Sequence, residues 1–268
     1  MRIIVLPTKE ETAQIGAALI AAVVDRDAAA VLGFATGSSP EPLYAALRSH
    51  AEHGLDFSRV TGFALDEYVG LDPAHPESYH SVLGREVVRP LGLDPARMHL
   101  PDGLADPDVA GPAYERAIAA GTGVALQILG VGANGHLGFN EPGSSFASRT
   151  REVTLTERTR DDNRRFFGGD LSLVPASAMT QGIGTILQAR SLLLVANGGH
   201  KAAAIRAALE GPQSSSCPGS AVQLHPSVTV LLDAEAASEL DRVDYYAHAN
   251  AAWLDRVRGW PAVRALQH

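Results

Sequence analysis

The sequence has little of what several classes of protein depend on. It holds one cysteine among 268 residues, Cys217, so the chain cannot form an internal disulfide or a cluster of thiolate ligands for a metal. No apolar run reaches the 18 residues that a membrane-spanning helix requires. Lys and Arg number 22 against 30 Asp and Glu, and this balance argues against nucleic-acid binding, which depends on clustered cations. Membrane and nucleic-acid partners are therefore not expected.

The sequence also lacks the features of a signal peptide and of a boundary between domains. Its first apolar run, Arg2-Ile-Ile-Val-Leu6, has none of the flanks of a signal peptide, so we expect a cytoplasmic protein. No low-complexity linker and no internal repeat is found. With 46% hydrophobic and 19% charged residues, the composition is that of an ordinary globular protein, and we expect one domain over residues 1–268.

Short runs of Val, Ile and Leu alternate with longer segments of helical periodicity. The runs lack polar alternation, as strands buried on both faces do, and they cover residues 2–6, 31–35, 60–65, 124–130, 191–196 and 227–232. Helical spacing is found at 8–25, 40–51, 107–120 and 199–209. Because parallel strands need crossover helices, the pattern predicts an α/β fold. We expect a doubly wound, mostly parallel sheet with helices on both faces, a three-layer Rossmann-like arrangement.

Residues 143–190 are less regular than the rest of the chain. Within them, 149–155 has the pattern of an extended strand, and 157–167 has that of a helix. We expect this segment to form an irregular lid, an active-site flap within the single domain.

The glycine-rich segment 129–142 is the most informative part of the chain. It follows an apolar strand and reads Leu129-Gly-Val-Gly-Ala-Asn-Gly-His-Leu-Gly-Phe-Asn-Glu-Pro142. Ligands of α/β sheets bind at the carboxyl ends of the strands. His136 can exchange protons near neutral pH, and Glu141 is close enough in sequence to orient the imidazole or share its work. The alternative is a histidine tied into a glycine-rich turn.

A second segment, residues 33–40, also follows an apolar strand and predicts an anion site. Pro40 suits the first position of a helix and Ser39 suits its cap, so free backbone N–H groups and the positive end of the helix dipole would face a ligand such as phosphate. A capped turn without a ligand is the alternative. Neither the Walker pattern nor the dinucleotide fingerprint Gly-x-Gly-x-x-Gly is present.

Adjacent carboxylates follow a third apolar strand. Asp66 or Glu67 is a candidate general base, because side chains alternate along a strand and one of the two can point into the crevice, where burial raises its pKa. A helix cap or a surface charge pair is the alternative. The segment His75-Pro-Glu-Ser-Tyr-His80 has no metal-binding spacing, so no metal site is expected.

Cations near these segments are candidates for neutralising a phosphate. Lys201 opens a helix after an apolar strand, and Arg165 lies beside two phenylalanines on the expected flap. Other arginines of this part of the chain fit a solvated helix face equally well; they are Arg149, Arg151, Arg158, Arg160 and Arg164. Cys217 lies in a turn with no partner base and is not expected to be a nucleophile.

Together these segments resemble the glucosamine-6-phosphate deaminases. The resemblance runs nearly end to end and rests on the joint presence and order of Leu-Gly-Phe-Ala-Thr-Gly-Ser-Ser-Pro40, Leu-Asp-Glu-Tyr-Val-Gly-Leu71, His75-Pro-Glu-Ser-Tyr79, Gly-His-Leu-Gly-Phe-Asn-Glu-Pro142, Ser148-Arg-Thr-Arg151, Met179-Thr-Gln-Gly-Ile-Gly-Thr185 and Lys201. It implies a doubly wound sheet and the conversion of D-glucosamine 6-phosphate and water to D-fructose 6-phosphate and ammonia, in amino-sugar catabolism. It implies no cofactor.

The resemblance also implies roles for individual residues. His136 opens the sugar ring with support from Glu141, and Asp66 takes the proton from C2. The phosphate is implied to bind the turn of Gly37, Ser38 and Ser39 together with Arg165 and Lys201, in agreement with the helix-terminus argument.

The chain departs from the family pattern at two positions. Asn134 stands where many members have aspartate; it can hold the imidazole but cannot carry charge, so we expect a pH profile governed by Asp66 and His136, and an acidic limb that Asn134→Asp leaves unaltered. Val153 stands where some members have a lysine near an allosteric site formed by equivalents of Ser144, Ser145 and Arg151. We therefore expect weak or absent activation by N-acetylglucosamine 6-phosphate.

Three alternatives remain open at the level of sequence. A 6-phosphogluconolactonase-type hydrolase has a similar glycine-histidine loop, although Asn140-Glu141-Pro142 and Asp66-Glu67-Tyr68 favour the deaminase. A non-enzymatic sugar-phosphate-sensing domain would need a DNA-binding module, which we do not expect here. A nicotinamide-dependent dehydrogenase would need the missing glycine fingerprint. Homo-oligomers are common in the family, and residues 245–253 predict either an exposed apolar helix face or a cap on the core of the chain itself.

Overall fold

The apolar runs form the central sheet of the molecule. The computed structural model describes residues 1–260. Seven strands lie in the order β1-β10-β9-β6-β2-β3-β5, and the paired strands run parallel. They are β1 (Arg2–Leu6), β2 (Val31–Phe34), β3 (Thr61–Ala64), β5 (Met98–His99), β6 (Leu126–Leu129), β9 (Leu192–Ala196) and β10 (Val228–Asp233). All six predicted strands are confirmed, and β5 is an addition at the sheet edge.

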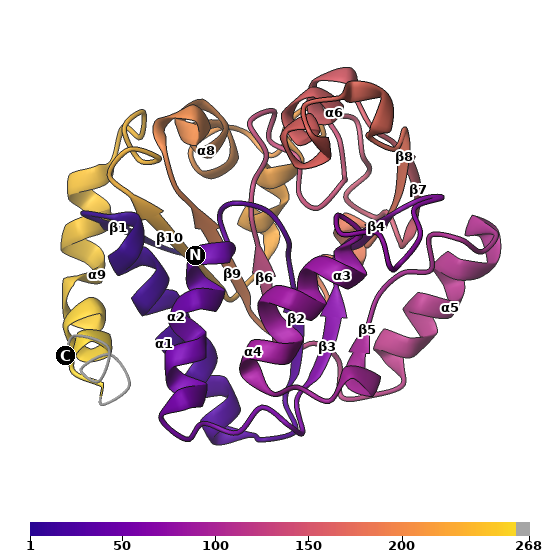
Figure 1. The fold of residues 1–268 in the computed structure, drawn as a ribbon. Helices are drawn as coiled ribbons and strands as arrows, with labels where there is room; N and C mark the ends of the chain where they lie inside the picture. Colours follow the sequence, from indigo (N-terminus) through magenta and orange to yellow (C-terminus); the bar gives the residue numbers. More distant parts are fainter. Residues whose placement is uncertain (261–268) are drawn as a thin grey trace.

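Helices pack around this sheet, as the crossover argument requires (Figure 1). The α-helices are α1 (Lys9–Arg26), α2 (Glu41–Glu52), α3 (Tyr79–Leu83), α4 (Arg89–Leu91), α5 (Pro107–Ala119), α6 (Glu157–Asn163), α7 (Ile183–Ile186), α8 (Ala202–Leu209) and α9 (Val243–Arg258). A π-helical turn, Gly84–Val88, joins α3 to α4. Short 3-10 helices are η2 (Pro95–Arg97), η3 (Arg164–Phe167), η4 (Leu171–Leu173), η5 (Gly199–Lys201) and η6 (Pro218–Leu224). The predicted mostly parallel α/β fold is confirmed.

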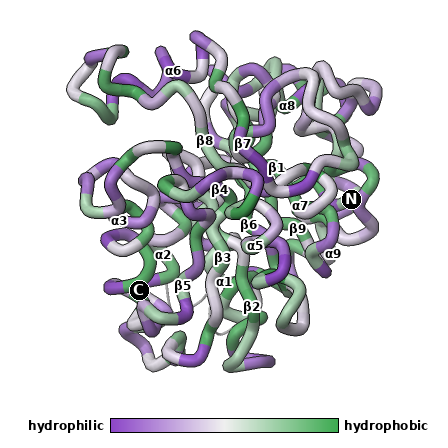
Figure 2. The backbone as a smooth tube through the Cα atoms, turned by 90° about the vertical axis from the view of Figure 1, so that its right-hand side faces the viewer, coloured by the Kyte–Doolittle hydropathy of each residue, from purple (hydrophilic) through white to green (hydrophobic). Residues whose placement is uncertain are grey.

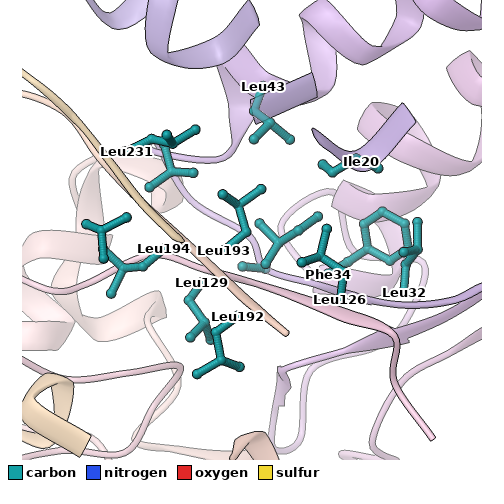
Figure 3. Packing of buried hydrophobic residues seen from close by; sticks show 14 of the residues in the cluster. Ile20, Leu32, Phe34, Leu43, Leu126, Leu129, Leu192, Leu193, Leu194 and Leu231 are labelled. Atoms are coloured by element: carbon teal, nitrogen blue, oxygen red, sulfur yellow. The ribbon is translucent and has the colours of Figure 1, made fainter. Parts of the chain in front are cut away.

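The core lies where the apolar strands meet the helices. Figure 3 shows leucines of β6, β9 and β10 gathered with Ile20 of α1 and Leu43 of α2. Ile20 and Leu43 are fully buried, and so is Leu194 at the centre of β9. Burying side chains of this size contributes about 1.5–3 kcal/mol each to stability. The carboxyl ends of the strands are therefore held on a rigid base.

Helix α9 caps this core. It lies beside β1 at one side of the molecule (Figure 1), where Tyr246 and Val257 are buried and Trp253 is partly buried against the core. Of the two interpretations of residues 245–253, the internal cap holds for Tyr246 and Trp253, whereas Tyr245 is exposed. None of the helices in residues 1–260 combines the length and apolar composition needed to cross a bilayer.

A second, antiparallel sheet lies beside the carboxyl ends of the main strands. Its order is β4-β8-β7, formed by β4 (Asp66–Tyr68), β7 (Arg151–Thr154) and β8 (Ser177–Thr180). The sequence predicts the extended segment that contains β7, but not β4 or β8, which are too short and too polar to have a strand pattern. This sheet joins the Asp66 segment to the irregular region 143–190.

The region 143–190 continues from β7 into α6 and η3. The predicted helix 157–167 is confirmed as these two consecutive pieces. In Figure 2, α6 is a largely hydrophilic arm above α3. Whether this region moves as a flap stays a prediction.

Candidate active site

The carboxyl ends of β2, β3, β6 and β9 meet around a cavity of about 320 Å³. Side chains from six separate parts of the sequence line it, and they include six of the predicted site residues: Ser38, Ser39, Asp66, His136, Arg165 and Lys201. Asn134 and Glu141 lie behind His136 rather than in the lining, and Gly37 lines a smaller neighbouring cavity. The groups that sequence patterns suggested separately are thus brought to one place.

Asp66 and Glu67 point to different environments because they alternate along β4. Asp66 lines the cavity and is 5% exposed, and burial, reinforced by the charge of Glu67, holds the pKa of its carboxyl well above the ordinary value. Glu67 accepts hydrogen bonds from the backbone N–H groups of Tyr68, Tyr79 and His80 at 2.8–3.0 Å. Asp66 is therefore the candidate base, and Glu67 holds the start of α3, which is the structural alternative considered for this pair.

The loop after β6 presents His136 to the cavity. The ring lies directly against Gly132, where an added Cβ would fall 2.2 Å from two ring atoms. His136 Nδ1 is buried, has no hydrogen-bond partner within residues 1–260, and lies 3.7 Å from Glu141 Oε2. The far side of the loop is fixed by a bond from the Gly219 N–H to the Gly135 carbonyl at 2.7 Å. The imidazole therefore faces a carboxylate on one side and the cavity on the other.

Glu141 is held as an anion. Its Oε2 accepts from Asn134 Nδ2 at 2.7 Å, and its Oε1 accepts from the N–H and the hydroxyl of Thr156, each at 3.2 Å. Burial alone would raise the pKa of Glu141, but the His136 imidazole and the Thr159 hydroxyl beside it lower that pKa to about 2. Glu141 therefore presents an anionic carboxylate 3.7 Å from the imidazole Nδ1.

Asn134 does not hold the imidazole, which corrects the sequence-based expectation. Its Oδ1 accepts from the backbone N–H of His136 at 3.1 Å, and its Nδ2 is bound to Glu141. The amide thus fixes the loop backbone and the carboxylate. A charged side chain at position 134 would therefore disturb the contact with Glu141 and not a contact with the imidazole ring.

The opposite end of the cavity is built for an anion. Lys201 Nζ donates to Ser39 Oγ at 2.6 Å, and Lys201 is 8% exposed. Burial and the nearby charge of Arg165 lower the pKa of Lys201 to about 8. Arg165 comes from η3 and lines the same cavity. A dianion bound here would relieve the repulsion between the two cations.

Two details of this end differ from the expectation. Helix α2 begins at Glu41, with Pro40 in the cap position, and no side chain caps it. Ser39 is not the cap, because its hydroxyl accepts from Lys201 instead. The turn still lines the cavity through Ser38 and Ser39, directly before the start of α2.

Several residues of the lining were not predicted. On α6 they are Arg158, which the sequence named only as an arginine that fits a solvated helix face, Thr159, Asp162 and Asn163, and elsewhere they include Thr36, Tyr79 and His200. The helical pattern of 157–167 placed the first four on one element, but only the fold shows which face of it meets the cavity. Thr156 was also missed, because a threonine before a helix is an ordinary cap signal.

The arginine near the expected effector site is occupied by internal contacts. Arg151 donates to Asn140 Oδ1 at 2.9 Å and to Ser144 Oγ at 3.1 Å. Val153 lies on the same strand, β7, and packs against the cluster that contains Phe139. In the part of the chain that the structure describes, no group of three or more His, Cys, Asp and Glu residues is arranged to bind a metal.

Comparisons with known proteins agree with this geometry. A family model described as glucosamine-6-phosphate isomerases/6-phosphogluconolactonase matches residues 8–231. Glucosamine-6-phosphate deaminases of Bifidobacterium longum (strain DJO10A) and Streptomyces avermitilis are 51% and 52% identical; the first comparison covers 92% of this chain and 95% of the relative, and the second 95% and 98%. A solved structure described as a monomeric glucosamine-6-phosphate deaminase is 43% identical, with a TM-score of 0.87 over 89% of this chain and 100% of that one.

A more distant structure shares the fold alone. The 6-phosphogluconolactonase from Trypanosoma brucei is 18% identical, with a TM-score of 0.73 over 89% of this chain and 98% of that one. This similarity shows the fold and leaves the chemistry to be argued from the site.

Proposed function

Because the chain belongs to the family of glucosamine-6-phosphate isomerases and 6-phosphogluconolactonases, we propose that it acts as a glucosamine-6-phosphate deaminase in amino-sugar catabolism. It converts D-glucosamine 6-phosphate and water to D-fructose 6-phosphate and ammonia. The observation that carries this proposal is the single cavity that joins Asp66 and His136 to the cationic end at Ser39, Lys201 and Arg165.

The first step opens the sugar ring. His136 takes the proton of the anomeric hydroxyl and returns it to the ring oxygen, which breaks the bond between C1 and that oxygen and leaves an open-chain aldehyde. The imidazole carries a positive charge between the two transfers. Glu141 remains an anion 3.7 Å from Nδ1, so it stabilises that charge without taking the proton.

The second step moves hydrogen from C2 to C1. Asp66, in its ionised form, takes the proton from C2, the electron pair forms a double bond between C2 and C1, and the aldehyde oxygen takes a proton from the ammonium group of the substrate, which gives an enol-amine. Protonation at C1 then gives a ketimine at C2. A carboxylate that burial makes more basic is suited to this step, because it accepts a proton from carbon more readily than an ordinary carboxylate does.

The last step releases ammonia. Water adds to C2 of the ketimine, and the bond between C2 and nitrogen breaks as the nitrogen leaves with an added proton. The ketose that remains is fructose 6-phosphate. Each step is a proton transfer or an addition of water, and the proposal assigns no role to a cofactor.

The cationic end supplies orientation. A phosphate bound by Ser38, Ser39, Lys201 and Arg165 places the sugar carbons toward Asp66 and His136. Binding energy from this non-reacting group can be used to align the reacting atoms. A sugar without phosphate is therefore expected to lose turnover as well as affinity.

The deaminase is favoured over its alternatives by Asp66. Hydrolysis of a lactone requires no removal of hydrogen from carbon, and a sensing domain requires no base, whereas C2 deprotonation needs the buried carboxylate that the cavity contains. The relatives at about 50% identity are also named deaminases.

The test is ammonia release from glucosamine 6-phosphate, measured beside hydrolysis of 6-phosphogluconolactone. We expect ammonia release by the wild-type protein and a loss of at least about a thousandfold in Asp66→Asn, because the general base is removed. Asp161→Asn is the matched control, since Asp161 pairs with Arg164 outside the cavity. Lactone hydrolysis without ammonia release would overturn the proposal.

The proposed site comes from one chain, so it does not require a second copy for its side chains. The homo-oligomer and the cytoplasmic location expected from the sequence stay predictions. The structural relative described as monomeric favours a single chain as the working unit.

A further inference from the structure

Thr156 occupies the point where the helix over the cavity begins and where Glu141 is held. Its N–H and its hydroxyl both lie 3.2 Å from Glu141 Oε1. The same hydroxyl oxygen accepts the N–H of Thr159, which makes Thr156 the N-cap of α6. The hydroxyls of Thr156 and Thr159 lie 3.1 Å apart, so the two threonines form a hydrogen-bonded pair beside the Glu141 carboxylate.

These contacts determine which way the Glu141 carboxylate faces. With Oε1 fixed by Thr156, Oε2 is left for Asn134 and for His136 Nδ1. The carboxylate belongs to a residue that is 8% exposed, so water does not compete freely for either oxygen. Loss of the Thr156 donors would allow the carboxylate to turn away from the imidazole.

The same segment reaches the phosphate end of the cavity. Helix α6 runs from Glu157 to Asn163 and continues directly into η3, which carries Arg165. Thr156 and Arg165 therefore lie at opposite ends of one short helical segment. One end touches the carboxylate behind the proton carrier, and the other contributes the cation expected to bind phosphate.

On the basis of the proposed function, we propose that Thr156 is a positioning residue that orients Glu141 toward His136 and links that orientation to the folding of α6 over the cavity. It does not touch the reacting atoms. Its effect acts through Glu141, so it concerns ring opening rather than the C2 proton transfer at Asp66.

Three substitutions separate this role from helix capping alone. Thr156→Ser keeps both the cap and the hydroxyl donor. Thr156→Asp keeps a cap acceptor for α6 but places a carboxylate against Glu141. Thr156→Val removes both the cap acceptor and the hydroxyl donor and keeps the branched shape of the side chain. Thr154→Val, at an exposed position of β7, is the matched control for loss of a threonine hydroxyl.

We expect kcat for ammonia release to fall about tenfold or more in Thr156→Val, with KM changed by less than about threefold, because a hydrogen bond to a charged group is lost. In Thr156→Asp, kcat falls at least as far as in Thr156→Val. In Thr156→Ser, kcat stays within about twofold of the wild-type value. The acidic limb of kcat/KM moves to higher pH in the Val and Asp variants, since Glu141 loses the Thr156 hydroxyl donor and keeps only the backbone N–H.

The proposal is overturned if Thr156→Asp restores wild-type kcat, since capping alone would then explain the residue. It is equally overturned if Thr156→Val retains wild-type kcat or if Thr156→Ser is as impaired as Val. A 13C NMR titration of the Glu141 carboxyl provides a readout without turnover, in which Thr156→Val raises its pKa from about 2. This titration separates failure of the inference from failure of the proposed function, because it applies even to a wild type that releases no ammonia.

Discussion

Asp66 and Glu67 are adjacent in the sequence and have different tasks. The residue pattern identified the pair and only the family resemblance chose Asp66, because a choice on physical grounds depends on which side of β4 faces the cavity. Pairing of β4 with β8 fixes that side, and the three backbone N–H groups around Glu67 occupy its carboxylate. The assignment of Asp66 as the base therefore depends on tertiary structure.

Asp66→Asn should raise stability while it removes activity. Because the folded pKa of Asp66 is raised, the ionised carboxylate costs stability as pH rises from its unfolded pKa through the folded one. We expect the variant to be more stable than the wild type at neutral pH, because the neutral amide does not carry the cost of a buried charge. The Tm of the variant should exceed that of the wild type at pH 7.5, by roughly 2–4 °C for each kcal/mol of added stability. Near pH 3, where Asp66 is protonated in both states, the two Tm values should be equal. A loss of stability at pH 7.5 would contradict the assigned burial of the charge.

Lys201 should make anion binding pH-dependent. Its pKa of about 8 means that the free enzyme loses this cation as pH rises above 8. The inhibition constant of inorganic phosphate should therefore rise by up to about tenfold per pH unit above 8 in the wild type. In Lys201→Met, inhibition should be weak and nearly independent of pH over the same range. An equal pH dependence in both proteins would assign the titration to another group.

Asn134→Asp should alter the acidic limb of the pH profile, contrary to the expectation from the sequence. The substitution places a carboxylate where Nδ2 now donates to Glu141 Oε2 at 2.7 Å. Two carboxylates at that distance share a proton, so the pKa of the pair rises. We expect kcat/KM to decline at a higher pH on the acidic side than in the wild type. An unchanged acidic limb would contradict the contact between Asn134 and Glu141.

At the scale of elements, the strands and helices that could be predicted from the sequence are those with long and regular apolar patterns. The six apolar strands and the main helices could be predicted because their patterns are long enough to separate a period of two or an unbroken apolar run from a period of 3.6. The strands β4, β5 and β8 have two to four residues each, and none of them contains a run of Val, Ile and Leu. Such elements are determined by tertiary contacts.

The glycine-rich loop can hold the His136 ring in its observed position only because Gly132 has no Cβ. In Gly132→Ala the new methyl group would fall 2.2 Å from the His136 ring, so the ring must move. We expect kcat to fall by about a hundredfold, the order of loss that misplacement of a catalytic group by about 1 Å causes. Gly121→Ala is the control, because an added Cβ there meets no atom within 4 Å. Wild-type kcat in Gly132→Ala would show that the ring position is not critical.

At the scale of the whole molecule, the site couples a small antiparallel sheet to the main parallel one. The sequence indicated that the Gly37–Ser39 turn, the Asp66 strand and the 132–141 loop would meet, because strand ends of an α/β sheet share one edge. The sequence predicted that 143–190 lies over this edge as a flap, but it could not show the path of the segment through β8 and α6. That path depends on the pairing of β7 with β8 and of β8 with β4.

Allosteric activation is a property of the whole molecule, and the residue at position 153, Val153, affects whether the effector can bind. The side chain is apolar and packs against the cluster of Phe139, so β7 offers no cation at this position. We expect hyperbolic kinetics with N-acetylglucosamine 6-phosphate giving less than about twofold activation. Steady-state rates with and without this compound check the expectation, and sigmoidal kinetics that micromolar effector relieves would contradict it. Sedimentation of the same samples reports whether more than one chain is assembled.

The central claim is that Asp66 removes the C2 hydrogen of an amino-sugar phosphate. The most direct measurement follows glucosamine 6-phosphate in D2O by NMR with wild type and with Asp66→Asn. The account predicts ammonia and fructose 6-phosphate with solvent deuterium at C1 from the wild type, and neither product nor exchange at C2 from the variant. Ammonia released together with an aldose that keeps its C2 hydrogen, or wild-type exchange by Asp66→Asn, would contradict it.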